Sequence, residues 1–185
     1  MTQHILIYTL GPVQDFIKQA RRTRDLWFGS HVLSELSRAA ARSIAGVNGA
    51  ELVFPALARG HRELTPCWTF LREGEAYADD AGLSRYREGG DPPVNVANKI
   101  VAILPGDTDP AAVARAARQA VQALWREVAR YVQWRCRKVL AAGIDAAWLE
   151  QVDGLLEHLA AWKPYEDGGY AAARRAVEDA IAGRK

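Results

Sequence analysis

The residues with the clearest chemical potential lie at a turn near the start of the chain. Gly11 and Pro12 follow the short apolar run 5–10, and Val13 and Gln14 begin a segment with helical spacing. Glycine permits a close backbone approach, proline suits a first helical turn, and the N–H groups that a helix leaves unpaired there can face an anion. The turn is a candidate contact for nucleotide phosphates, or else a plain connection between a strand and a helix. Because no acidic residue occupies it, we expect no metal ion there.

Two groups of basic residues could contact RNA or a protein partner. The first follows the turn, and the second recurs at helical spacing further along the chain. They are Lys18, Arg21, Arg22 and Arg24 in the first group, and Arg115, Arg118, Arg126, Arg130 and Arg137 in the second. Contacts of this kind with an RNA backbone weaken as the salt concentration rises. The alternative for both groups is a solvated surface, with intrahelical ion pairs such as Arg21 with Asp25.

Serine and tryptophan side chains add to these candidates. Ser30 and Ser34 lie one turn apart on a predicted helix and are expected to face the nucleotide side of the turn. Trp125 and Trp134 lie beside an apolar stripe rather than on it, which favours a buried contact with a partner. Trp27, in contrast, is expected to fill the core.

The sequence contains no recognisable catalytic constellation. The histidines at positions 4, 31, 61 and 158 form neither an HD pair nor an H-x-x-x-H motif, which argues against a metal hydrolase. The run EGGDPP over residues 88–93 has a proline where a Gly-Gly-Asp-Asp hairpin has its second acid, so it offers no carboxylate pair for two-metal phosphoryl transfer. We therefore expect neither a catalytic residue nor a metal site in this chain.

The composition is that of an ordinary globular protein. Of the 185 residues, 49% are hydrophobic and 25% are charged, and the formal net charge is +2. These values exclude disorder, predict about one domain and imply that any basic surface is local. There is no apolar run of about 18 residues that would span a membrane, and no signal peptide is expected. Cys67 and Cys136 suggest neither a disulfide framework nor a zinc site, so we expect a reducing, cytoplasmic setting.

Strands and helices must hold these residues in place in the first half of the chain. Apolar runs bounded by glycine or proline predict strands, which cover residues 5–10, 51–54 and 94–104. Helical spacing predicts helices near 13–28 and 31–45, either separate or continuous through Gly29. Asp25 is expected to cap the segment near Gly29 and Ser30.

The second half is predicted to be mostly helical. Asp109 and Pro110 fit an N-cap and a first helical position, and an apolar stripe continues from there to Val139. Further helices are expected over residues 146–156, with Asp145 as the cap, and 170–182, while 158–165 fits either a strand or a helix.

The order of these elements predicts the fold class. The sequence β-α-β-β-α, with room for a further strand, indicates an α+β fold of the ferredoxin-like (split βαβ) kind, with an antiparallel sheet and long helices on one face. We expect a single domain over residues 1–185. Residues 55–93 would be an irregular insertion, with a short strand over 68–71, and such a segment usually has a function or wraps a partner. Residues 143–185 would be an extension made of a strand and a helix.

Residues 11–34 resemble the signature of one protein family. The matching positions are GPVQxFI at 11–17, AR at 20–21, TRDLW at 23–27 and GSxxLS at 29–34. The family is the large, polymerase- and cyclase-like subunit of type III CRISPR effector complexes of the Cmr kind, in its first palm domain. Looser likenesses cover VANKIVAILP at 96–105, where Ala97 replaces the family's proline, and residues 155–162 and 170–185.

The resemblance implies a fold, a cofactor and partners. It implies a palm domain whose fourth strand lies over residues 155–162. In that family a second palm domain has the Gly-Gly-Asp-Asp hairpin that makes cyclic oligoadenylate from ATP, and the first palm lacks it. The implied cofactor is therefore ATP with Mg²⁺ in a longer parent protein, of which this chain is expected to be a piece. The implied partners are the second palm domain, other effector subunits and the guide and target RNA, with no membrane.

Two hypotheses follow for the function. In the first, the chain is a non-catalytic palm domain. Its turn at 11–14, with Ser30 and Ser34, forms one wall of a shared ATP site, its basic residues contact the rest of the complex, and the chain alone is no enzyme. In the second, it is a free-standing module that binds RNA or protein and has no nucleotide site.

Overall fold

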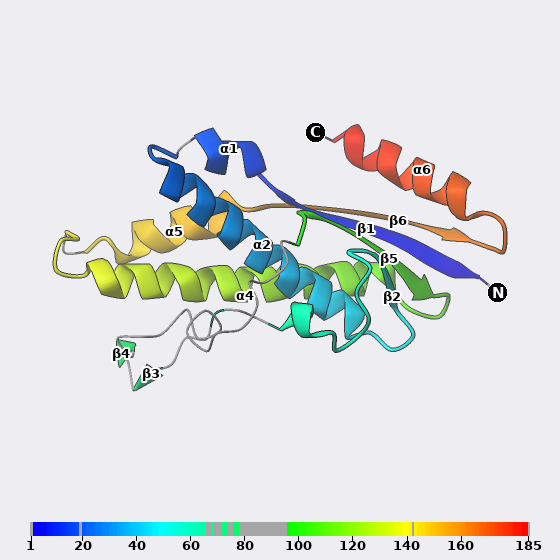
Figure 1. The fold of residues 1–185 in the computed structure, drawn as a ribbon, viewed down its shortest axis with the longest axis horizontal. Coiled ribbons are helices and arrows are strands. Elements are labelled where there is room, and N and C mark those ends of the chain that lie inside the picture. The colour runs from blue at the N-terminus through cyan, green and yellow to red at the C-terminus, as the bar shows by residue number, and fades with distance from the viewer. Residues whose placement is uncertain are drawn as a thin grey trace.

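The computed structural model describes residues 2–18, 20–65, 68, 72–73, 76–77, 96–141 and 143–184. Its elements, in chain order, are β1 (Gln3–Gly11), α1 (Val13–Lys18), α2 (Thr23–Ala45), β2 (Glu51–Phe54), the 3₁₀ helix η1 (Arg62–Leu64), β3 (Arg72–Glu73), β4 (Ala76–Tyr77), β5 (Lys99–Pro105), α4 (Pro110–Cys136), α5 (Asp145–Leu155), β6 (Glu157–Tyr165) and α6 (Tyr170–Ala182) (Figure 1).

The main sheet has the topology that the sequence predicted. Its strand order is β2-β5-β1-β6, and each neighbouring pair is antiparallel. β1 and β2 are thus separated by β5, which is the split βαβ order of a ferredoxin-like fold. The α+β prediction is confirmed. So is the fourth strand that the resemblance placed over 155–162, although β6 begins at Glu157 and continues to Tyr165.

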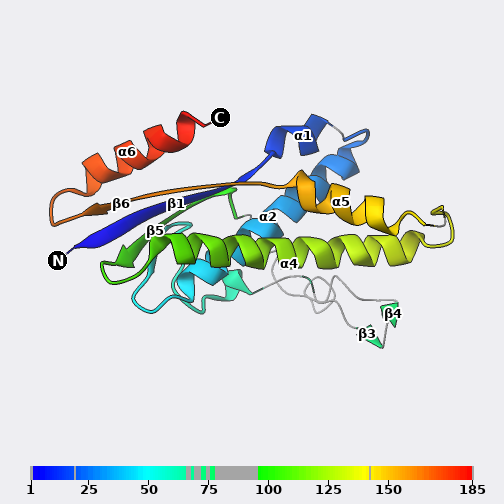
Figure 2. The ribbon, with the colours of Figure 1, turned by 180° about the vertical axis from the view of Figure 1, so that it is seen from behind.

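Helices cover both faces of this sheet. Figures 1 and 2 place α2 and α4 on one face and α6 on the other. Leu6 and Tyr8 of β1 point into the core beneath α2 and α4, while Ile5 and Ile7 pack against α6. A strand buried on both sides is apolar at every position, which explains the continuous apolar run over 5–10. The prediction of long helices on one face holds for α2 and α4, but the sequence did not indicate that α6 would cover the opposite face.

The chain breaks between α1 and α2 earlier than the sequence suggested. α1 has six residues and ends at Lys18, and α2 then runs from Thr23 through Gly29 without interruption. The carboxylate of Asp25 accepts a hydrogen bond from the backbone N–H of Arg22 (3.1 Å), which starts α2 at this point. The prediction that Asp25 caps the chain near Gly29 and Ser30 was therefore wrong, because it caps the other end of the segment.

The long helix α4 begins as predicted and ends sooner. Asp109 accepts a hydrogen bond from the N–H of Ala111 (2.9 Å), and Pro110 is the first helical residue. The helix ends at Cys136, so Val139 leaves the apolar stripe and is 83% exposed. Asp145 is the first residue of α5 rather than its cap, and makes no capping hydrogen bond.

The insertion after β2 is anchored to the core at its described residues. Leu64 and Trp68 are buried in the cluster that includes α2 and α4. The predicted strand over 68–71 lies outside the described residues apart from Trp68, as do Cys67 and the run 88–93. In the part of the chain that the structure describes, no helix is long and apolar enough to cross a membrane.

Candidate functional site

The predicted turn lies where β1 leaves the sheet. Gly11 is the last residue of β1 and Val13 is the first of α1. Asn98 holds this end of the strand, because its side-chain amide donates to the carbonyl of Leu10 (3.0 Å) and its backbone carbonyl accepts from the N–H of Leu10 (2.9 Å). Asn98 belongs to the VANK run of the second family likeness, and it positions the turn.

A carboxylate that the sequence did not place here lies beside the turn. Glu157 pairs with Gly11 across β1 and β6, and a Cβ built on Gly11 would lie 3.5 Å from its Oε2 atom. An anion at the turn would be repelled by this carboxylate. Moreover, α1 is too short to offer the dipole of the longer helix that the sequence predicted.

A cavity adjoins the turn and collects three of the six predicted nucleotide contacts. Its volume is about 470 Å³, within the usual range for small-molecule sites. Val13, Ser30 and Ser34 line it, whereas Gly11, Pro12 and Gln14 do not. The other lining residues are Leu26, Trp27, Leu33, Val96, Ala97 and Asn98. We call this the turn cavity.

The side chains of the turn cavity have different tasks. Ser34 is buried, and its hydroxyl accepts a hydrogen bond from the N–H of Val96 (2.7 Å), so it fixes the segment before β5. Ser30 is exposed and open to a ligand. Trp27 was predicted to fill the core, but it is 71% exposed. That prediction was wrong because the buried part of α2 begins only at Val32, so Leu26, Trp27 and Phe28 precede the contact with the core and are all exposed.

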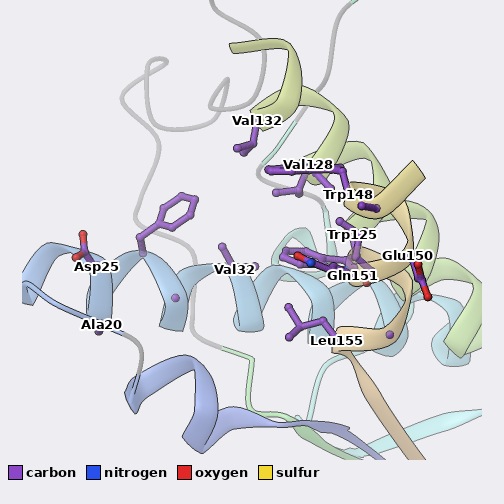
Figure 3. Close-up of a pocket in the computed structure, with 16 residues that line it drawn as sticks. Ala20, Asp25, Val32, Trp125, Val128, Val132, Trp148, Glu150, Gln151 and Leu155 are labelled. Atoms are coloured by element: carbon purple, nitrogen blue, oxygen red, sulfur yellow. Dashed lines mark hydrogen bonds between the residues drawn. The ribbon is translucent and has the colours of Figure 1, made fainter. Parts of the chain in front are cut away.

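A second, larger cavity of about 1070 Å³ lies on the other side of α2 (Figure 3). It is enclosed by α2, α4 and α5, and most of its lining is apolar, including Val32, Val128 and Leu155. Asp25 and Glu150 are its only charged lining residues among the described residues. Two carboxylates and no cation make this cavity unsuitable for phosphates.

The chain was compared with models of known protein families. Residues 5–130 match the family described as CRISPR-associated protein Cmr2, N-terminal. The chain belongs to the Cmr2 family. Cmr2 is the large subunit of type III-B CRISPR complexes, so the resemblance stated from residues 11–34 is confirmed. No curated protein matches the chain.

The matched range of this Cmr2 chain contains the whole lining of the turn cavity, but only part of the lining of the larger cavity. It extends from β1 through most of α4, and therefore includes the turn, α2 and Asn98, while α5, β6 and α6 follow it. Family membership also implies association with the other type III-B effector subunits. The surfaces available for such association include the basic residues that have no strong ion pair within the described part of the chain.

Most of the second basic group on α4 is engaged within this Cmr2 chain. Arg126 forms a two-point ion pair with Asp153 of α5 (Nε to Oδ1 2.7 Å, Nη2 to Oδ2 2.9 Å), which lowers the pKa of that carboxyl. Next to it, the indole N–H of Trp125 donates to the carbonyl of Val152 (2.8 Å). The buried contact that the sequence predicted for Trp125 thus lies inside the chain, against α5.

Other residues of this group also have partners on α4 or next to it. Arg115 lies 3.5 Å from Asp109, Arg130 lies 3.2 Å from Glu127, and the Arg137 guanidinium lies 4.4 Å from the centre of the Trp134 ring. These contacts are those of a solvated helix surface, the alternative that the sequence left open.

The first basic group, by contrast, is displayed around the start of α2. Lys18, Arg21, Arg22 and Arg24 are all exposed. The ion pair of Asp25 is with Arg24 (3.8 Å) rather than with Arg21, because Arg21 precedes the helix. This group lies close in sequence to the turn cavity, whose Leu26 and Trp27 follow directly.

One of the four histidines, His158, forms a pair with Tyr8, and the charge of Arg118 acts on this pair. The hydroxyl of Tyr8 and Nδ1 of His158 form a hydrogen bond (2.6 Å). Burial raises the pKa of Tyr8, and burial together with the charge of Arg118 lowers the pKa of His158 to about 4. Both groups are neutral near pH 7, and their hydrogen bond joins β1 to β6.

Proposed function

We propose that this chain is the non-catalytic palm domain of a type III-B effector subunit, and that the turn cavity is one wall of an ATP site shared with a second palm domain. The family match supplies the setting. The observation that supports the site best is the turn cavity itself, in which Val13 and Ser30 lie next to an indole ring that is 71% exposed.

The lining of the turn cavity suits the base and ribose of ATP better than its phosphates. An exposed tryptophan offers a flat face on which adenine can stack, and Ser30 and Asn98 are polar groups near it. Among the described residues no cation lines the cavity, and Glu157 lies beside the turn. The phosphates would therefore point away from the sheet, toward the exposed Arg21, Arg22 and Arg24 or toward the second palm domain.

The proposal assigns Mg²⁺ to the second palm domain rather than to this chain. Among the described residues there is no group of three or more histidine, cysteine, aspartate or glutamate side chains that could hold a metal ion. In the proposal, Mg²⁺ and the carboxylates that act on ATP come from the second palm domain. This chain contributes by binding and orienting the nucleotide, and it does not turn ATP over alone.

The first basic group is the surface that we assign to RNA or to other subunits. Its arginines are exposed beside the site, and the ion pair of Arg24 with Asp25 is long at 3.8 Å, whereas Arg126 of α4 lies 2.7 Å from Asp153. Breaking such pairs to bind RNA would offset part of the gain. RNA affinity through Arg21, Arg22 and Arg24 should fall steeply between about 50 and 200 mM salt.

The test of the nucleotide site is a titration of the purified chain with ATP and Mg²⁺. Trp27→Ala is expected to weaken ATP binding about tenfold, because base stacking on an aromatic ring contributes about 1–3 kcal/mol. The matched control is Trp162→Ala, which removes a 42% exposed tryptophan of β6 that does not line the cavity. Equal losses in both variants, or no saturable ATP binding by the unaltered chain, would refute the site.

A second variant tests the phosphate position. Glu157→Gln removes the carboxylate beside the turn and should tighten ATP binding if the phosphates pass near Gly11, since their repulsion is relieved. An unchanged affinity would place them on the side of the basic group. Cyclic oligoadenylate made from ATP by the purified chain alone would contradict the non-catalytic role.

A further inference from the structure

A third cavity lies at the far end of α2 from the turn cavity. Its volume is about 360 Å³, and it is lined by Arg42 in the last turn of α2 and by Arg59, Gly60, His61 and Thr65 of the loop after β2. No acidic residue is part of this lining in the described chain. We call it the arginine cavity.

The loop owes its shape to a turn at Gly60. The N–H of His61 donates to the carbonyl of Ala58 (2.9 Å), and Gly60 has a φ of +76° between them. This is a conformation that favours glycine and reverses the chain tightly. Arg59 and Gly60 are the two central residues of this turn, and His61 follows them. All three line the cavity.

Two buried anchors fix this loop against α2. Leu64 is 3% exposed within the core, and the buried guanidinium of Arg38 donates to the carbonyl of Glu63 while pairing with Glu35 (3.1 Å). Arg42 follows Arg38 by one helical turn, so it lies on the same side of α2. The η1 turn lies beside the C-terminal half of α2 in Figure 1. The loop that contains Arg59 and His61 is therefore fixed beside the last turns of α2, which contain Arg42.

The donors in the arginine cavity fit an anion with several oxygens. The N–H of Glu63 donates to Nδ1 of His61 (3.2 Å), so the neutral imidazole has its proton on Nε2 and is a hydrogen-bond donor there. Two guanidinium groups add charged, planar donors that match phosphate oxygens. Glu63 itself is 7% exposed and does not line the cavity. Gathering these groups without a carboxylate costs repulsion that a bound anion relieves.

We propose that the arginine cavity is a phosphate-binding site in which Arg42, Arg59 and His61 hold one phosphate group. Arg42 alone has another explanation, since a cation in the last turn of a helix offsets the helix dipole. That explanation does not extend to Arg59 and His61, which belong to the loop. The phosphate belongs either to a free phosphate compound or to the backbone of a single-stranded RNA, and the site is independent of the proposed ATP cavity.

The experiment measures binding of three probes to the purified chain: inorganic phosphate, pyrophosphate and a labelled single-stranded oligouridylate. The variant is Arg42→Gln combined with Arg59→Gln. Its control is Arg175→Gln combined with Arg184→Gln, which removes the same charge from exposed positions in and after α6. Affinity for the bound probe should fall about tenfold in the first variant and stay near its original value in the control. Circular dichroism checks that both variants are folded.

The probes separate the two sources of phosphate. Oligouridylate that binds and is displaced by pyrophosphate points to an RNA backbone, and phosphate or pyrophosphate that binds without oligouridylate points to a free compound; either result supports the site. The proposal fails if no probe binds saturably, or if the control loses affinity as much as the variant does. ATP binding that depends on Trp27 should be unchanged in the Arg42 and Arg59 variant, so failure of one site is distinguishable from failure of the other.

Discussion

The two halves of α2 have opposite environments. In the first half, Leu26, Trp27 and Phe28 are 39%, 71% and 56% exposed, although they are large and apolar. In the second half, Leu36 and Ile44 are fully buried, and even the ion pair of Glu35 and Arg38 is removed from solvent. The helix α2 is thus buried in the core from Val32 onward, while the large apolar side chains of its first two turns are exposed.

This difference indicates that the buried part of α2 stabilises the fold, whereas the exposed part offers a surface to a ligand or a partner. Exposed aromatic side chains gain no hydrophobic free energy where they are, and clusters of them mark surfaces for ligands or partners. Both the turn cavity and the larger cavity of Figure 3 adjoin the exposed half, through Trp27 and Phe28 respectively. Substitutions in the two halves should therefore change different properties of the protein.

The largest effect is expected at Arg38. Arg38→Ala should lower the free energy of unfolding by about 3–5 kcal/mol, because it leaves the carboxylate of Glu35 buried without its partner and frees the loop at Glu63. Urea unfolding measures the loss. Arg42→Ala, one turn later and exposed, is the control and should cost less than about 0.5 kcal/mol. Similar losses for the two arginines would contradict the contrast between buried and exposed positions.

Ser34 is expected to show an intermediate effect. Ser34→Ala removes the acceptor for the buried N–H of Val96, which costs about 1–3 kcal/mol of unfolding free energy. Ser30→Ala changes the same residue type on the exposed side of α2 and should leave unfolding within about 0.5 kcal/mol. If Ser34 bound a ligand instead of the backbone, its replacement would leave the midpoint of urea unfolding unchanged.

The pair of Tyr8 and His158 should make stability depend on pH. The pKa of His158 is lowered from 6.5 to about 4 in the folded chain. The unfolded chain therefore takes up a proton as the pH falls below 6.5, whereas the folded chain resists it until near 4. The contribution of His158 to the free energy of unfolding is therefore fully present above pH 6.5 and is lost as the pH falls toward 4.

The decline attributable to His158 should be about 1 kcal/mol between about pH 7.5 and pH 5, once solvent screening of a half-buried ring is allowed for. His158→Gln should remove this part of the decline, which urea unfolding of both proteins at the two pH values measures. A decline that is the same in the variant would assign it to other groups.

The smallest effect on stability is expected for Trp27. Trp27→Ala should change the free energy of unfolding by less than about 0.5 kcal/mol, because an indole that is 71% exposed loses little contact. The same variant is expected to have the largest effect on ATP binding among those named here. A marked loss of stability would mean that Trp27 packs against the fold, and the contrast between the halves of α2 would not stand.

Regular patterns made much of the architecture predictable. The apolar runs at 5–10 and 51–54 became β1 and β2, and the capped, amphipathic run after Asp109 became α4. The run at 94–104 became β5 only from Lys99 onward, because residues 96–98 lie before the strand. Residues 158–165, nearly all of β6, fitted either a strand or a helix, because they alternate weakly and are held in the sheet by β1, which is distant in sequence. Only the resemblance placed a strand there.

The sequence by itself determined which segments form strands and helices, since local spacing and caps depend on neighbouring residues. It also determined the family, since the GPVQ and TRDLW runs are local. Only the tertiary structure decided that Trp27 faces solvent, that Glu157 lies beside Gly11, and that Arg42 meets Arg59 and His61. Each of these depends on how distant segments pack, and packing is set by the sum of many long-range contacts that no single local pattern contains.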